Sequence, residues 1–218
     1  MTARRLNTVQ EYYFSKKLRE VAAMVAEGKS VINMGIGSPD LPAHPAVLDA
    51  LKDSFDYPKL HQYQSYQGLP ELRKAIADFY KKYYHHTADP NSEILPLMGS
   101  KEGIMHISLA FLNPGDKVLI PNPGYPTYQS VTKLVESVPV FYDLKADNNW
   151  QPDLEALNQM ELSGVKLMWI NYPHMPSGAN ALRSIFKKLI SWAKEKEIIL
   201  VNDNPVSYTH LRAHETGR

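Results

Sequence analysis

The chain has 218 residues, of which 44% are hydrophobic and 22% charged, a formal net charge of +1 and no cysteine. This is the composition of a folded protein without disulfides or thiolate metal sites, and its near-neutral charge favours neither nucleic acid nor an acidic membrane as a partner. The sequence has no apolar run of roughly 18 residues and no apolar signal segment at its start, so the default expectation is a soluble, cytoplasmic protein.

The first part of the chain predicts helices with little sheet. Gly28 ends the first of these helices, and a short strand is expected over residues 31–34 before a loop rich in glycine and proline over 35–42. Helices are expected over residues 15–27, 44–55 and 69–83.

From residue 93 onwards, strand and helix patterns alternate. Strands are expected over 93–98, 117–120, 138–142, 165–170 and 197–201, and helices over 101–112, 126–136, 153–160 and 181–196. This alternation predicts an α/β fold with a largely parallel sheet covered by helices on both faces. Residues 206–218 break the pattern, and we interpret them as a foreign tail, the alternative being a frayed terminal segment.

Two strand ends carry polar residues. Asn171 closes the apolar run 165–170, and Asp203 follows the apolar run 198–201. The carboxyl ends of parallel strands meet at one edge of a sheet, where α/β proteins bind ligands. Taken singly, Asn171 could be an Asx-turn residue before Pro173 and Asp203 a helix cap.

Residues 98–103 join a predicted strand to a predicted helix. Gly99 allows a tight turn, so that backbone N–H groups near Ser100 and Lys101 can face an anion at the start of the helix. The alternative is an ordinary strand-to-helix turn. The segment is not a Walker loop, because no Gly-Lys-Ser/Thr follows at the required spacing.

Residues 121–128 follow the predicted strand 117–120 and contain three prolines. The prolines stiffen the loop, and Tyr125 within it can lie flat on a heterocycle. The alternative is that Tyr125 is a half-buried loop aromatic.

Over residues 1 to about 205, these segments resemble the class I/II aminotransferases of pyridoxal-phosphate (PLP) dependent fold type I, the aspartate aminotransferase superfamily. The resemblance implies a three-layer αβα large domain that binds PLP. In that family, the segment matching Gly99, Ser100 and Lys101 binds the cofactor phosphate. The aromatic matching Tyr125 stacks on the pyridine ring.

The resemblance also gives roles to the two strand ends. Asn171 would donate a hydrogen bond to the phenolic oxygen of PLP. Asp203 would keep the pyridine nitrogen protonated, which makes it the catalytic residue that this chain contributes.

Two further segments match the same family. Residues 61–73 resemble a segment whose tyrosine, here Tyr63, reaches the cofactor phosphate of the neighbouring subunit, which implies a homodimer. Residues 35–40 resemble a loop whose glycine, here Gly37, lies over the substrate carboxylate. A dinucleotide motif at this loop is disfavoured, because its third glycine position is Asp40.

The resemblance implies three regions in this chain and several family residues that the chain does not contain. Residues 1–40 would form the N-terminal arm and the start of the small domain, residues 41–205 an incomplete PLP-binding large domain, and residues 206–218 a non-native tail. Val206 stands where the family has a tyrosine. The Schiff-base lysine and the arginine that binds the substrate carboxylate would lie beyond the chain, together with the last strands and the C-terminal small domain. We therefore expect the chain alone to be inactive.

The implied reaction is amino-group transfer from an amino acid to a 2-oxo acid. Residues 169–176 look most like diaminopimelate-type and broad-specificity members. PLP-dependent C–S lysis or decarboxylation on the same fold remains an alternative, as does a non-catalytic PLP-binding regulatory module. His210 and His214 have metal-ligand spacing but lie in the expected tail, so we predict no metal site.

Overall fold

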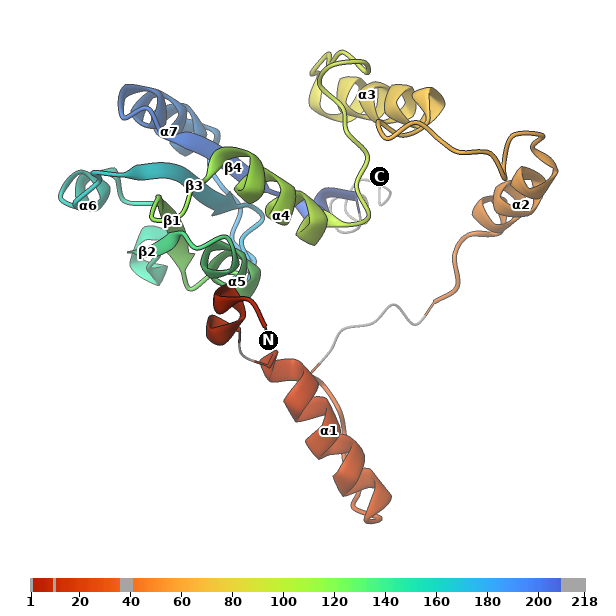
Figure 1. The fold of residues 1–218 in the computed structure, drawn as a ribbon, viewed down its shortest axis with the longest axis horizontal. Helices are drawn as coiled ribbons and strands as arrows, with labels where there is room; N and C mark the ends of the chain where they lie inside the picture. The colour runs from red at the N-terminus through yellow and green to blue at the C-terminus, as the bar shows by residue number, and fades with distance from the viewer. Residues whose placement is uncertain (1, 10, 36–40, 209–218) are drawn as a thin grey trace. The chain divides into compact units, whose positions relative to one another are not determined.

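A computed structural model describes residues 2–9, 11–35 and 41–208 (Figure 1). The contacts within the chain define two units, one formed by residues 1–9 and 97–218 and the other by residues 10–96. Each unit is described by itself, and the expected domain boundaries at residues 40 and 205 stay predictions.

A four-stranded parallel sheet lies at the centre of the first unit. Its strands are β1 (Lys117–Asn122), β2 (Val138–Asp143), β3 (Val165–Asn171) and β4 (Ile199–Asp203), in the order β2-β1-β3-β4. The predicted strands from residue 117 onwards are therefore confirmed.

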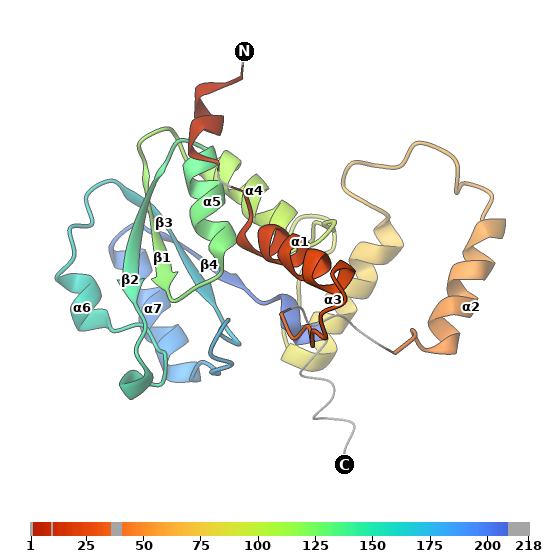
Figure 2. The same ribbon diagram turned by 90° about the horizontal axis from the view of Figure 1, so that it is seen from below.

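Two pairs of helices cover the two faces of this sheet (Figures 1 and 2). One pair is α4 (Ser100–Phe111) and α5 (Pro126–Leu134), and the other is α6 (Leu154–Asn158) and α7 (Arg183–Glu195). The expected αβα layering is confirmed. Short 3₁₀ turns are η1 (Arg4–Thr8), η3 (Ala146–Asn148) and η4 (Pro205–Tyr208).

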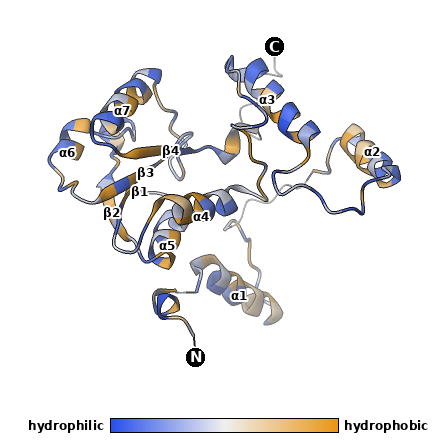
Figure 3. Ribbon diagram, turned by 45° about the horizontal axis from the view of Figure 1, so that its top comes forward, coloured by the Kyte–Doolittle hydropathy of each residue, from blue (hydrophilic) through white to orange (hydrophobic). Residues whose placement is uncertain are grey.

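Alternating side chains of the strands form two separate cores. Val118, Leu167 and Trp169 pack with α4 and α5, whereas Leu119 and Met168 pack with α6 and α7. Successive residues of a strand point to opposite faces, so a strand covered on both sides is mainly apolar. In Figure 3, the strands are coloured largely as hydrophobic.

The strand order reverses between β1 and β3. The chain leaves β1 for β2 on one side and then returns to β3 on the other side of β1. In open α/β sheets, this reversal leaves a crevice at the carboxyl ends of the two central strands, and ligands bind there. The loop after β1 carries Tyr125, and β3 ends at Asn171.

Two predicted strands are wrong. Residues 93–98 form a turn and an irregular segment, and residues 31–34 form no regular element. A proline does not explain this, since β1 and β2 contain Pro121 and Pro139 and are paired. A strand needs a neighbouring strand for its backbone hydrogen bonds, and a local apolar run does not specify that neighbour. The expectation rested on apolar content alone.

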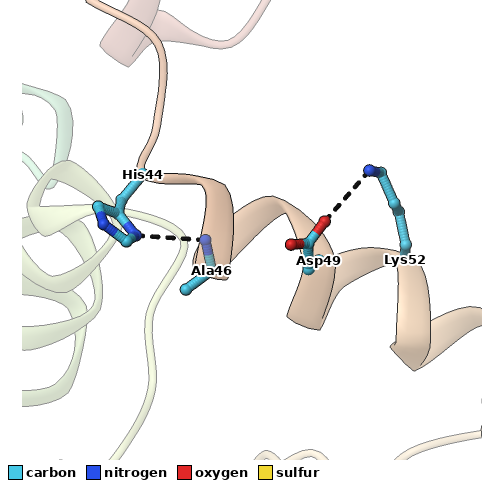
Figure 4. A network of polar contacts seen from close by, with 4 residues as sticks. All are labelled: His44, Ala46, Asp49 and Lys52. Atoms are coloured by element: carbon cyan, nitrogen blue, oxygen red, sulfur yellow. Dashed lines mark hydrogen bonds and ion pairs between the residues drawn. The ribbon is translucent and has the colours of Figure 1, made fainter.

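The second unit contains the helices α1 (Tyr13–Ala26), α2 (Pro45–Asp53) and α3 (Pro70–Tyr84), with the 3₁₀ turn η2 (Ser54–Asp56). His44 caps α2 by accepting a hydrogen bond of 3.2 Å from the Ala46 N–H group, and Lys52 pairs with Asp49 at 3.2 Å (Figure 4). Arg73, at the start of α3, is buried and donates to the carbonyl groups of Gln67, Gly68 and Pro90.

Over the described ranges, none of the helices is long and apolar enough to cross a membrane.

Candidate functional site

Asn171 and Asp203 are direct partners in the ladder between β3 and β4. The Asn171 side-chain amide donates to the backbone carbonyl of Asp203 at 2.6 Å. Its oxygen accepts from the Met175 N–H group at 2.7 Å. Asn171 therefore joins the ends of two strands and holds the loop that follows β3. This is not an Asx turn, because the oxygen accepts from a residue four positions on and Pro173, two positions on, has no N–H group.

Asp203 is a buried carboxyl group at the end of β4, with 8% of its surface exposed. Its Oδ2 atom accepts a hydrogen bond of 2.7 Å from the Tyr128 hydroxyl, a residue of α5. Burial raises the pKa of Asp203, and the hydrogen bond from Tyr128 opposes that rise. A group held in this way at a strand end is suited to face a cationic ring nitrogen.

Tyr128 is the residue that sequence reasoning missed. Its ring is fully buried and stacks on Trp169, with centroids 5.2 Å apart and planes 9° from parallel. It lies in the first turn of the helix that directly follows Tyr125, and this closeness along the chain is the signal that could have found it.

Tyr125 and Lys101 extend the contacts from Asp203 to the start of α4. Tyr125 is half-buried and meets Tyr128 edge-on, with ring centroids 5.7 Å apart. The ammonium group of Lys101 lies 5.9 Å from the centroid of the Tyr125 ring. A continuous series of contacts thus leads from Lys101 through the two tyrosines to Asp203 and Asn171.

The start of α4 has the geometry of an anion site. Gly99 adopts φ +95°, which only glycine takes up without strain, and Ser100 is the first helical residue. The N–H groups of a first helical turn have no carbonyl partner within the helix. Glu102 accepts a hydrogen bond of 2.5 Å from the Met98 N–H group, which lowers the pKa of Glu102 and holds the turn in place.

His174 joins the loop after β1 to the loop after β3. Its Nε2 atom lies 3.1 Å from the Pro123 carbonyl oxygen, and its Nδ1 atom 2.6 Å from the Ser177 hydroxyl oxygen. Because a carbonyl only accepts, Nε2 carries the proton and Nδ1 accepts from Ser177. The imidazole is buried, at 2% exposure, and burial lowers its pKa.

We expect this neutral histidine to make stability depend on pH. As the pH falls below about 6.5, the unfolded chain binds a proton at His174 that the folded chain resists, so stability falls with a slope of at most about 1.4 kcal/mol per pH unit. Urea unfolding between pH 5 and 7 should show a smaller slope for His174→Gln than for the wild-type chain. The exposed His106→Gln variant is the control, and equal slopes for wild type and His174→Gln would contradict the expectation.

The remaining predicted residues lie outside the described part of the first unit. Tyr63 lies in the second unit, between η2 and α3, and its side chain is fully exposed. Gly37, His210 and His214 lie outside the described residues. Within the described part of the chain, no group of three or more His, Cys, Asp or Glu side chains could hold a metal ion.

A cavity of about 510 Å³ lies elsewhere in the first unit, along β2 and α6. Its lining includes Asp143, Lys145 and Gln151 but none of the residues that connect Lys101 to Asn171. The candidate site at the edge of the sheet is thus separate from this cavity.

Comparison with known proteins gives matches over nearly the whole chain. The LL-diaminopimelate aminotransferase of Aquifex aeolicus is 40% identical over 203 residues, which are 93% of this chain and 52% of that protein. The LL-diaminopimelate aminotransferase of Syntrophobacter fumaroxidans is 39% identical, over 96% of this chain and 53% of that protein. Among solved structures, apo-BacF of Bacillus subtilis matches with a TM-score of 0.87 and 36% identity, over 93% of this chain and 52% of that chain.

The chain spans about half the length of the curated relatives that it matches. The family model of aminotransferase class I and II matches residues 29–205. This range includes both strand ends, the start of α4 and the loop that carries Tyr125. The chain belongs to the class I and II family of PLP-dependent aminotransferases.

Proposed function

We propose that this chain supplies most of the cofactor site of an aminotransferase that moves an amino group from an amino acid to a 2-oxo acid. The observation that carries the proposal is the series of contacts from Lys101 to Asn171 at the point where the strand order reverses. An anion site, an aromatic surface and a buried carboxyl group follow one another along this series.

These residues fit PLP part by part. The N–H groups of Gly99, Ser100 and Lys101 suit its phosphate, because a helix start favours an anion. Tyr125 offers a half-buried ring for stacking. PLP, when bound, supplies a protonated ring that withdraws electrons from the α-carbon of the substrate.

Asp203 and Asn171 have different tasks in this proposal. The Asp203 carboxylate holds the proton on the ring nitrogen, since an opposite charge beside a cation favours the charged form. Asn171 offers its side-chain amide to the phenolic oxygen and, through its bond of 2.6 Å to the Asp203 carbonyl, ties the two strand ends together.

For the complete enzyme, we propose a homodimer in which Tyr63 serves the partner's cofactor and Gly37 lies over the substrate carboxylate. The names of two relatives at 40% and 39% identity favour a diaminopimelate-type amino donor. C–S lysis and decarboxylation use the same cofactor site. They are tested by asking whether a 2-oxo acid is consumed in proportion to the amino donor.

We further propose that no lysine among residues 1–218 binds PLP covalently and that the chain alone does not catalyse transfer. The 218-residue chain should bind one PLP reversibly in an absorbance titration, and pyridoxal without phosphate at least about tenfold more weakly, because the charge-assisted contacts at the helix start are lost. After borohydride reduction, mass spectrometry should find no stoichiometric label at a single lysine. Equal binding of pyridoxal and PLP, or labelling concentrated on Lys101, would overturn the assignment.

A further inference from the structure

The described residues give the Asp203 carboxyl group a partner within the chain, the Tyr128 hydroxyl, 2.7 Å from Oδ2. The two residues come from different elements, α5 and β4, and are 75 positions apart in sequence. Neither belongs to the loops that carry the phosphate or stacking contacts. The pair is therefore a feature of the folded core below the site.

We propose that Tyr128 is a positioning residue that holds Oδ2 of Asp203, leaving Oδ1 for the ring nitrogen of the cofactor. The inference rests on the proposed function in one respect, that the ring nitrogen of the cofactor binds to Oδ1 of Asp203. The hydrogen bond itself belongs to the chain without cofactor.

Tyr128 is held rigidly enough for this task. Its ring has no exposed surface, stacks on Trp169 and belongs to the core formed by α4, α5 and the sheet. The fixed ring holds the hydroxyl oxygen in place beside Oδ2 of Asp203. Because neither partner has to be ordered when the cofactor binds, the carboxylate is preorganised.

The Tyr128 hydroxyl also opposes the effect of burial on the charge of Asp203. Burial, with the charge of Asp203 beside it, raises the pKa of Tyr128, so its hydroxyl keeps its proton and always donates. Burial likewise favours a protonated Asp203, which could not hold a proton on the ring nitrogen. The hydrogen bond from Tyr128 favours the charged carboxylate. The hydroxyls of Tyr142 and Tyr125 are the other titratable groups near Tyr128, and both raise its pKa further.

The test compares two buried hydroxyl deletions in the 218-residue chain without cofactor. Tyr128→Phe keeps the ring and its stacking but removes the donor. Tyr142→Phe removes a buried hydroxyl that donates to the Trp169 carbonyl at 2.8 Å and does not touch Asp203. In ¹³C NMR titrations of the Asp203 carboxyl carbon, Tyr128→Phe should raise its pKa by about one unit, and Tyr142→Phe should leave it unchanged.

An unchanged or lowered pKa in Tyr128→Phe, or an equal rise in both variants, would overturn the proposal. If Tyr128→Phe does not fold, the wild-type chain decides the question. In a pH titration, the chemical shift of Tyr128 Cζ should then change with the same midpoint as that of the Asp203 carboxyl carbon. A Tyr128 Cζ shift that does not change as Asp203 titrates would contradict the hydrogen bond between the two residues.

A second readout separates this inference from the proposed function. With PLP labelled by ¹⁵N in its ring, the bound ring nitrogen should lose its proton at lower pH in Tyr128→Phe than in the wild-type chain or Tyr142→Phe. If PLP does not bind at all, the proposed function fails while the result for the Tyr128 and Asp203 pair stands. If PLP binds and the ring nitrogen titrates identically in all three, the positioning role is wrong.

Discussion

Replacing Asp203 with alanine is expected to lower the rate of amino-group transfer by about two to four orders of magnitude. Removing one member of a buried charge pair costs roughly 3–5 kcal/mol, and each 1.36 kcal/mol in the transition state is about tenfold in rate. The loss should fall on turnover more than on cofactor affinity, because the contacts near Ser100 and Tyr125 do not involve Asp203.

A chimaera that joins residues 1–205 to the remaining half of the Aquifex aeolicus relative allows this measurement. Stopped-flow rates of the half-reaction and PLP affinity should be compared for the parent, Asp203→Ala and Asp143→Ala. Asp143 is the matched control, since it ends β2 as Asp203 ends β4 but accepts a hydrogen bond from Asn122. If Asp203→Ala keeps more than about a third of the parent turnover, Asp203 is not the partner of the ring nitrogen.

Mixing two variants of this chimaera is expected to raise activity above that of either variant alone if Tyr63 serves the partner's cofactor. One variant carries Tyr63→Phe, and the other lacks the cofactor-binding lysine in the relative's half. In a hybrid two-fold dimer, one site then carries both lesions and the other carries neither. Each hybrid should therefore show about half the activity of the unmodified dimer.

Native mass spectrometry must first establish that the subunits have exchanged. Tyr66→Phe is the matched control, since Tyr66 is an exposed tyrosine of the same segment as Tyr63, and this variant alone should stay active. Exchanged dimers whose activity equals the weighted mean of the two parents would place Tyr63 in the site of its own chain.

The Asp203 carboxyl group is connected to the apolar core through Tyr128. Trp169 lies in the buried stretch of β3 from residue 167 to 171, and its ring stacks on the Tyr128 ring, whose hydroxyl donates to Asp203. A carboxylate that must stay charged in a buried position needs such a donor, because the surrounding apolar groups favour its neutral form.

Several features of this protein could be predicted from the sequence alone. The alternation of apolar runs and amphipathic stretches from residue 117 onwards predicts a parallel sheet between helix layers, since strands covered on both faces form nearly continuous apolar runs. The same pattern places Asn171 and Asp203 at strand ends. Local chemistry also makes Gly99 and Tyr125 candidates for the site, because a glycine turn before a helix and an aromatic in a proline-rich loop are both short-range features.

Other features were decided only by the tertiary structure. Residues 93–98 have the length and apolar content of a strand, yet the segment stays outside the sheet, because strand pairing requires a neighbour that the local pattern does not specify. The bond between Tyr128 and Asp203 spans 75 residues, and the bridge from His174 to Pro123 spans 51. The periodicity of a sequence records which face of an element is buried. Which side chains of two such elements meet, and which polar group a buried carboxylate receives as its donor, depends on how β1, β3, β4 and α5 pack together.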